Sequence, residues 1–220
     1  MKRKRRAEGP WRSFHVRPED EHYDVATYYS GAEASRYASS NAMKKIQHNL
    51  TLRALELALF PLDWRVLDAG CGAGFSLEVL REAGYKKIAG FDAVLDLLEH
   101  AKKKGFAVRL GDLRSIPFPA RSFDAILSIS ALQWLTARNA KENLEKVASE
   151  FWRVLKHGGK AVIQFYPRSE EEALEAGKAF RARGFKTTIV TDNPKNPRKR
   201  KVFILLSKEP TQAFKYRKKH

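Results

Sequence analysis

The sequence predicts an α/β fold in which a mostly parallel sheet is covered by helices on both faces. Short apolar stretches alternate with helical patterns from Trp64 onward, as in a chain of βα units. The first of these stretches runs into a glycine-rich turn, which is typical of the ligand-binding loop of such folds. The last two are joined by residues 192–200, which are too few for a helical crossover, so they should form an antiparallel hairpin.

The individual elements follow from the spacing of the apolar residues. We expect strands at residues 64–69, 87–92, 106–110, 123–130, 160–165, 186–191 and 202–207. The helices between them are expected at residues 75–83, 94–104, 139–156 and 170–183, and the third of these should end at Gly158-Gly159. Ahead of the sheet, the sequence predicts a short helix at residues 32–38 and a long one from Asn41, its expected N-cap, to about Phe60, before Pro61.

A chain of 220 residues suits a single domain with tails, and we place that domain at residues 21–208. Residues 1–20 and 209–220 are basic and polar, so we expect a mostly disordered N-terminal arm and a basic C-terminal tail. No apolar run suits a membrane span or a secretory signal. The one cysteine, Cys71, fits a reducing cytoplasm, and no cluster has the spacing of metal ligands.

The positive charge is the second informative property of the chain. Lysine and arginine number 42 against 25 acidic residues, which gives a formal net charge of +17. The charge is clustered at residues 2–6, 198–201 and 215–219. Such clusters predict salt-sensitive attraction to a polyphosphate, and we expect a nucleic acid as partner.

The glycine-rich turn spans Asp68–Gly74 at the end of the first strand. Gly70 permits the tight turn, and Gly72 and Gly74 let the backbone approach a ligand and let the next helix pack against the sheet. A plain strand–loop–helix connection can also be rich in glycine, so the turn alone leaves the ligand open. Cys71 occupies a small-residue position with no histidine near it in sequence, so we do not expect a nucleophile.

Acidic residues end three successive strands, which capping alone does not explain. After Asp68, Asp92 ends the second strand, where a carboxylate can accept hydrogen bonds from ribose hydroxyls or, alternatively, cap the next helix. Asp112 ends the third strand and could meet an adenine amine. Together these acids predict a nucleoside-type ligand. A carboxylate at Asp68 would repel a pyrophosphate, but it suits a ligand that carries an ammonium and a sulfonium group.

At Asp68–Gly74 the chain resembles motif I of the class I S-adenosylmethionine-dependent methyltransferases, D-x-G-x-G-x-G, without departure. The resemblance implies S-adenosylmethionine as cofactor. It also implies a Rossmann-like fold with seven strands in the order 3-2-1-4-5-7-6 and strand 7 antiparallel, which agrees with the hairpin inferred above.

Further stretches are similar to the family that makes 7-methylguanosine in eukaryotic small-subunit ribosomal RNA. They lie at residues 51–57, 116–118, 122–125, 128–135 and 164–167, within a similarity that extends from Tyr28 to Ser207. The resemblance implies guanine-N7 methylation of small-subunit RNA or a pre-ribosomal particle, in ribosome biogenesis. It also implies a small zinc-binding activator protein, which we expect to form a heterodimer by covering the edge of the strand at residues 106–110.

The ends of the chain depart from the eukaryotic family, which has a longer basic C-terminal extension. The compact, basic form suggests an archaeal source and a cytoplasmic protein. A eukaryotic source would place the protein in the nucleus or nucleolus.

The resemblance also implies the residues of a two-part site. The candidates for cofactor binding are Tyr28, Tyr37, Asp68, Gly70, Cys71, Gly72, Gly74, Asp92, Asp112, Leu113 and Ser128. On the substrate side, Gln133 could bond the guanine edge and Trp134 and Tyr166 could stack on the purine, with Pro167 turning the chain so that Tyr166 projects. Simple packing is the alternative for the four aromatic residues.

Guanine N7 has a lone pair and no proton to lose, so no general base is required and no catalytic residue is assigned. The expected task of the site is to position the reactants. Two other readings stay open: a methyltransferase of a small molecule, and a ribosome-assembly factor that binds S-adenosylmethionine but acts mainly by binding.

Overall fold

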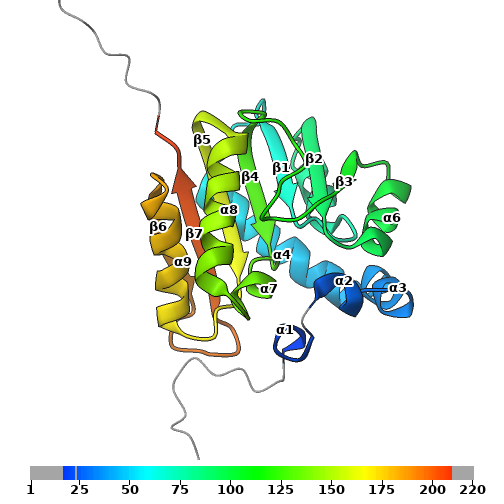
Figure 1. Ribbon diagram of the computed structural model, residues 1–220. Coiled ribbons are helices and arrows are strands. Elements are labelled where there is room, and N and C mark those ends of the chain that lie inside the picture. The colour runs from blue at the N-terminus through cyan, green and yellow to red at the C-terminus, as the bar shows by residue number, and fades with distance from the viewer. Residues whose placement is uncertain (1–16, 23, 210–220) are drawn as a thin grey trace, which may run out of the picture.

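A computed structural model describes residues 17–22 and 24–209 of the chain. Its seven strands form one sheet in the order β3-β2-β1-β4-β5-β7-β6 (Figure 1). β7 is antiparallel to both of its neighbours and the pairs among β1 to β5 are parallel, which confirms the expected fold class. The strands are β1 Arg65–Ala69, β2 Lys87–Asp92, β3 Val108–Leu110, β4 Phe123–Ile129, β5 Leu155–Phe165, β6 Lys186–Asp192 and β7 Lys201–Ser207.

Helices cover both faces of the sheet because successive strand residues point to opposite faces. Val66 belongs to the buried cluster that includes side chains of α4 and α5, whereas the next residue, Leu67, belongs to the cluster that includes side chains of α8 and α9. Figure 1 shows α8 and α9 in front of the sheet and α4 behind it. The helices of the described residues are α1 Pro18–Glu21, α2 Val25–Tyr28, α3 Ala32–Ser39, α4 Asn41–Ala58, α5 Phe75–Glu82, α6 Leu95–Lys103, α7 Gln133–Thr136, α8 Ala140–Val154 and α9 Glu170–Ala182.

Two expected helix boundaries are wrong. α8 ends at Val154 instead of Gly158-Gly159, because residues from Leu155 onward pair with β4 and extend β5. α4 is capped by Ser40, whose Oγ accepts a hydrogen bond from the Met43 amide at 3.2 Å, so Asn41 is the first helical residue and not the N-cap. Pairing with the sheet sets the end of α8, and the side-chain hydrogen bond of Ser40 sets the start of α4. Residue propensity alone does not distinguish these positions from their neighbours.

The start of the described chain is more ordered than the sequence predicted. Residues 17–20 were expected in a mostly disordered arm, but α1 forms there and Arg17 bonds to the main chain after β5. The rest of the expected arm and tail, residues 1–16 and 210–220, lies outside the described residues. None of the described helices combines the length and the apolar character that crossing a membrane requires.

Candidate functional site

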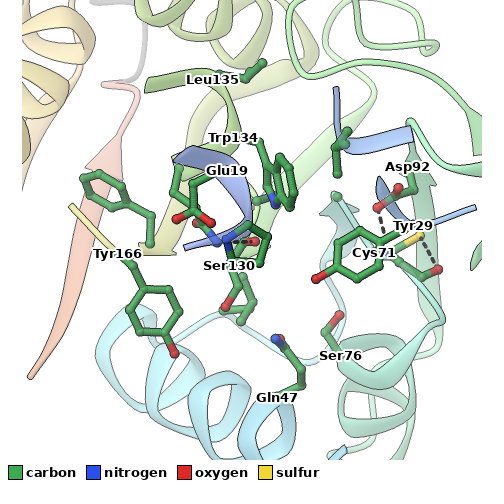
Figure 2. A pocket seen from close by; sticks show the side chains of 18 of the residues that line it. Glu19, Tyr29, Gln47, Cys71, Ser76, Asp92, Ser130, Trp134, Leu135 and Tyr166 are labelled. Atoms are coloured by element: carbon green, nitrogen blue, oxygen red, sulfur yellow. Dashed lines mark hydrogen bonds between the residues drawn. The ribbon is translucent and has the colours of Figure 1, made fainter. Parts of the chain in front are cut away.

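A cavity of about 820 Å³ opens at the carboxyl ends of the central parallel strands. Its walls come from the loops after β1, β2, β3, β4 and β5, from α1 to α4, and from the segment before β7. Figure 2 shows the side chains around it. This is the place in an open α/β sheet where ligands bind, and the volume is large enough for two ligand groups side by side.

The glycines of the loop after β1 serve different purposes. Gly70 has φ +84°, and a Cβ on it would lie 2.5 Å from Cβ of Ala131, so the loop after β4 approaches its backbone directly. Gly72 has φ +49° and lines the cavity. Gly74, with φ +83°, is not in the cavity wall: a Cβ there would meet Ala101 and Phe106 at 3.2 and 3.3 Å. Gly74 therefore lets the start of α5 pack closely against α6 and supports the loop from behind.

Asp92 links the end of β2 to this loop. Its Oδ2 accepts a hydrogen bond from the Gly72 amide at 2.8 Å, and its Oδ1 accepts one from the Val94 amide at 2.9 Å. The second bond is the capping role that the sequence left open, since Val94 directly precedes α6. Burial raises the pKa of the Asp92 carboxyl group above its usual value. The carboxylate is half-buried in the cavity wall, where further donors from a ligand can reach it.

Asp68 lies directly behind the cavity wall at the end of β1. Its side chain is fully buried, Oδ2 accepts a hydrogen bond from the Ser76 hydroxyl, and Oδ1 has no hydrogen-bond partner among the described residues. Burial, with a smaller contribution from the charge of Asp92, raises the pKa of Asp68 to about 7. A buried carboxyl oxygen without a donor is costly unless a ligand supplies one. This arrangement fits a ligand that brings positive charge close to Ser76.

The third strand-end acid is already paired within the chain. The Arg114 side chain donates hydrogen bonds to both carboxyl oxygens of Asp112, at 2.8 and 2.7 Å. Burial would raise the pKa of Asp112, but the hydrogen bonds and charge of Arg114 leave it below its usual value. Asp112 and Leu113 both line the cavity, so the predicted contact with an adenine amine stays a prediction.

Cys71 and Ser128 are packing residues in this structure. Cys71 lines the cavity but is buried, and its Sγ would lie 2.9 Å from a Cβ on Gly90, so the thiol fills the space above that glycine. Burial raises the pKa of the thiol well above its usual value, which disfavours a nucleophile. Ser128 is outside the cavity wall, and its hydroxyl donates to the Ala69 carbonyl oxygen at 2.8 Å.

A row of aromatic side chains forms one wall of the cavity. The ring centroid of Tyr29 lies 5.8 Å from that of Trp134 and 5.1 Å from that of Tyr37, and Tyr37 in turn lies 5.6 Å from Phe75. Tyr28 is not in the wall but packs behind it, 4.7 Å from Tyr29. Tyr29, and not the predicted Tyr28, therefore faces the cavity.

The far end of the cavity holds the expected substrate residues. Gln133, Trp134, Tyr166 and Pro167 all line it. The Gln133 amide nitrogen donates to the Ser130 carbonyl oxygen at 2.8 Å, while its buried Oε1 has no partner among the described residues. Lys201 Nζ lies 5.1 Å from the centroid of the Tyr166 ring.

The structure thus brings most of the predicted site residues to one cavity. Four of them, Tyr28, Asp68, Gly74 and Ser128, lie outside its wall. The cavity also contains residues that the sequence analysis missed, among them Arg17, Glu19, Tyr29 and Ser130. Tyr29 differs from Tyr28 only in the direction that the end of α2 gives its side chain. Arg17 and Glu19 lie in the stretch that the sequence predicts to be disordered.

Comparison with known proteins gives a consistent result. Residues 67–163 match the methyltransferase domain family. The chain is 35% identical over 178 residues to an 18S rRNA guanine-N7 methyltransferase of Saccharomyces cerevisiae. The aligned region covers 77% of this chain and 64% of the yeast protein. It is 37% identical over 199 residues to the 18S rRNA guanine-N7 methyltransferase of Bos taurus, and the aligned region covers 85% of this chain and 70% of the bovine protein. The chain therefore spans about two thirds of the length of these relatives.

The fold also occurs among solved structures. One chain of the complex between the Haloferax volcanii Trm112 methyltransferase activator and a methyltransferase has a TM-score of 0.61 and is 18% identical, with 86% of this chain and 100% of that chain covered. At this identity the likeness shows a common fold. The two curated relatives come from eukaryotes, so they do not support the archaeal source expected from the sequence.

Proposed function

Because the chain belongs to the family of the 18S rRNA (guanine-N7)-methyltransferases, we propose that it transfers a methyl group from S-adenosylmethionine to N7 of a guanine in small-subunit ribosomal RNA. The observation that carries the proposal is a single cavity that joins the glycine loop to the aromatic residues Trp134 and Tyr166. A cavity of about 820 Å³ can hold a cofactor and a purine base next to each other, as in-line transfer requires.

The cofactor belongs in the half of the cavity around Gly72 and Asp92. The Asp92 carboxylate would hold the ribose hydroxyls, and the unpartnered oxygen of Asp68 would provide negative charge behind the ammonium group. When bound, S-adenosylmethionine supplies a methyl group on a sulfonium, whose leaving group is a neutral thioether. S-adenosylmethionine has no pyrophosphate group. It therefore suits this half of the cavity, where two carboxyl groups lie close to the loop and would repel a pyrophosphate.

Guanine belongs in the half around Trp134 and Tyr166. Flat aromatic side chains there provide a surface on which an unstacked RNA base can stack. Methylation leaves the base with a positive charge, which the face of an aromatic ring stabilises. Because N7 carries a lone pair and loses no proton, these residues need only orient the base and keep water out.

An RNA substrate also fits the charge at the rim of the cavity. Arg198, which is exposed, and Lys201, which is half-buried, line the cavity together with Arg17. Arg200 also lines it but is buried and donates to the Pro194 carbonyl oxygen. Cations at the mouth would attract the phosphates on either side of the target guanine. A small-molecule substrate would not require them.

The partner proposed for this chain is a small zinc-binding activator protein that covers β3. β3 lies at one edge of the sheet, and Leu110 at its end is 57% exposed. Leu95 at the start of α6 is 51% exposed. An apolar strand at an open edge favours the addition of a strand from a partner. A chain of the same fold forms a complex with the Trm112 methyltransferase activator of Haloferax volcanii, which supports an activator as the kind of partner. The protein would act where the small ribosomal subunit is assembled, which is the nucleolus in a eukaryote.

The proposal is tested with the full chain and its candidate activator, labelled S-adenosylmethionine and unmodified small-subunit particles. The RNA is digested to nucleosides after the reaction. Labelled 7-methylguanosine is the expected product, and its formation should require an intact Asp92. Tight cofactor binding without any labelled RNA nucleoside, with or without the activator, would overturn the proposal in favour of a small-molecule methyltransferase or an assembly factor.

A further inference from the structure

The buried residue of α1 is a glutamate, which is unusual for a side chain that carries a charge. Glu19 is 8% exposed and lines the cavity. Figure 2 shows its carboxyl group pointing into the space between the side chains of Trp134 and Tyr166. No other side chain among the described residues donates a hydrogen bond to this carboxyl group. Its own backbone amide donates a hydrogen bond to it. A carboxylate has several acceptor positions, so capacity remains for donors from a ligand in the cavity.

The position of Glu19 is fixed from both sides along the chain. On one side, Arg17 donates hydrogen bonds to the carbonyl oxygens of Tyr166, at 2.6 Å, and of Pro167, at 3.2 Å. On the other side, Asp20 pairs with Arg168, with N–O distances of 2.6 and 2.9 Å. These contacts tie α1 to the chain that follows β5, so the carboxyl group is held in place before a ligand arrives.

Gln133 presents a second acceptor to the same space. Its amide nitrogen donates to the Ser130 carbonyl oxygen. Because the amide oxygen cannot donate to a carbonyl, Oε1 must be the atom that faces away from Ser130. This oxygen is buried and has no partner among the described residues, and Gln133 itself is 7% exposed. The cavity wall near Trp134 therefore offers two kinds of acceptor, a carboxylate and an amide oxygen.

We infer that Glu19 is the residue that selects guanine, with its carboxylate accepting hydrogen bonds from N1–H and the 2-amino group of the target base. This inference rests on the proposed function and names the recognition device of that site. Guanine is the RNA base that carries an N1–H and an adjacent amino group on one edge, whereas adenine has an acceptor at N1. A carboxylate therefore fits guanine and repels adenine. Gln133 Oε1 can accept the second hydrogen of the amino group.

The same contact leaves the reacting atom free. N7 lies on the opposite side of the purine from N1 and the 2-amino group, so a base held by Glu19 directs N7 away from α1. In Figure 2, Glu19 and Tyr166 lie at one end of the cavity and Asp92 lies at the other, next to the glycine loop. As N7 gains the methyl group the base becomes cationic, which makes N1–H a stronger donor to a carboxylate. The hydrogen bond is therefore stronger in the transition state than in the ground state.

The groups around Glu19 act on its pKa in both directions. Burial raises the pKa of Glu19 above its usual value, and the charge of Asp20 adds to that rise. The hydrogen bond from its own backbone amide and the charges of Arg17 and Arg168 oppose it. The backbone amide and the two arginines thus favour the ionised form of a carboxyl group that burial disfavours.

The test uses the full chain with its activator and two RNA substrates, one with guanosine and one with inosine at the target position. Inosine keeps N1–H and N7 but lacks the 2-amino group. The isosteric variant Glu19→Gln is compared with Glu21→Gln, a change of the same kind on the exposed side of the same helix. Binding of S-adenosylmethionine and thermal unfolding are measured for each variant, so that a loss of folding or of the cofactor site is recognised separately.

We expect Glu19→Gln to lower kcat/KM for guanosine RNA by at least ~20-fold, the effect of losing a charge-assisted hydrogen bond, with unchanged cofactor affinity. The wild-type protein should prefer guanosine RNA over inosine RNA clearly more than Glu19→Gln does, and Glu21→Gln should behave as the wild type. Equal guanosine preference in the wild type and Glu19→Gln would overturn the inference, as would full activity of Glu19→Gln. If the wild type methylates no RNA, the proposed function fails instead.

Discussion

The backbone amide of Gly72 donates a hydrogen bond to Oδ2 of Asp92, 2.8 Å away, and this bond fastens the glycine loop after β1 to the end of β2. The hydrogen bond therefore holds the loop and the carboxylate together, although Asp92 belongs to the next βα unit along the chain. The same carboxylate holds the Val94 amide ahead of α6. A change at Asp92 should affect both the loop and the ligand it serves.

We expect Asp92→Asn to weaken S-adenosylmethionine binding by at least ~10-fold. The amide loses the charge that strengthens the bonds to the loop and to the ribose hydroxyls. Isothermal titration calorimetry measures the affinity, and Asp63→Asn, an exposed residue before β1, is the matched control. Equal affinities of the two variants would show that Asp92 is a structural cap alone.

Gly70→Ala should destabilise the protein more than Gly158→Ala. Both glycines have positive φ, +84° and +79°, so both variants pay for an unfavourable backbone conformation. Gly70 additionally places the new Cβ 2.5 Å from Ala131, whereas no atom lies within 4 Å at Gly158. We expect a loss of roughly 3 kcal/mol at Gly70 against about 1 kcal/mol at Gly158, measured by urea unfolding. Equal losses would mean that the loop after β4 can move away freely.

The raised pKa of Asp68 predicts how stability depends on pH. Its folded-state pKa of about 7 lies above the ordinary value of 3.8, so between these values the folded protein holds a proton that the unfolded chain has released. Stability from this group is therefore lost as pH rises through that window, by on the order of 4 kcal/mol in total.

The variant Asp68→Asn removes this titration while Asp92 remains in both proteins. We expect the free energy of unfolding of the ligand-free wild type to fall, relative to Asp68→Asn, between about pH 4 and pH 7. Ser76→Ala should extend the fall to higher pH, because the Ser76 hydrogen bond lowers the pKa of Asp68. Parallel curves for the wild type and Asp68→Asn would contradict the buried, proton-holding carboxyl group.

Leu110→Glu should abolish binding of the activator without unfolding the chain. A charge at the open edge of the sheet blocks the addition of an apolar strand. The control is Leu174→Glu, which changes a leucine of similar exposure, 47% against 57%, on α9. Analytical ultracentrifugation of each variant with the activator measures the heterodimer. If Leu110→Glu still forms it, the activator binds elsewhere.

Much of the fold could be predicted because its signals are local. The apolar runs, the glycine turn at Asp68–Gly74 and the short connection before β7 each constrain one element, and together they fix the class and the hairpin. The ends of helices and strands were less predictable where pairing with a distant strand sets them. Gly158 and Gly159 look like a helix end, but the sheet extends through them.

The candidate site was predictable where backbone geometry dictates residue type, as at Gly70 and Asp92. It was not predictable where the direction of a side chain depends on tertiary packing. Tyr28 and Tyr29 are equivalent in sequence, yet the turn after α2 directs Tyr29 into the cavity. Glu19 could not be found, because its position depends on contacts between α1 and the chain after β5, about 150 residues away.

The central claim is that the methyl group goes to N7 of guanine in small-subunit RNA, and a substrate that lacks this atom tests it most directly. Small-subunit RNA containing 7-deazaguanosine has a C–H group in place of N7 and keeps the edge that Glu19 would contact. With the activator and labelled S-adenosylmethionine, we predict label in ordinary RNA, recovered as 7-methylguanosine, and none in the 7-deazaguanosine RNA. Equal labelling of the two RNAs, or recovery of the label in another nucleoside, would contradict the account.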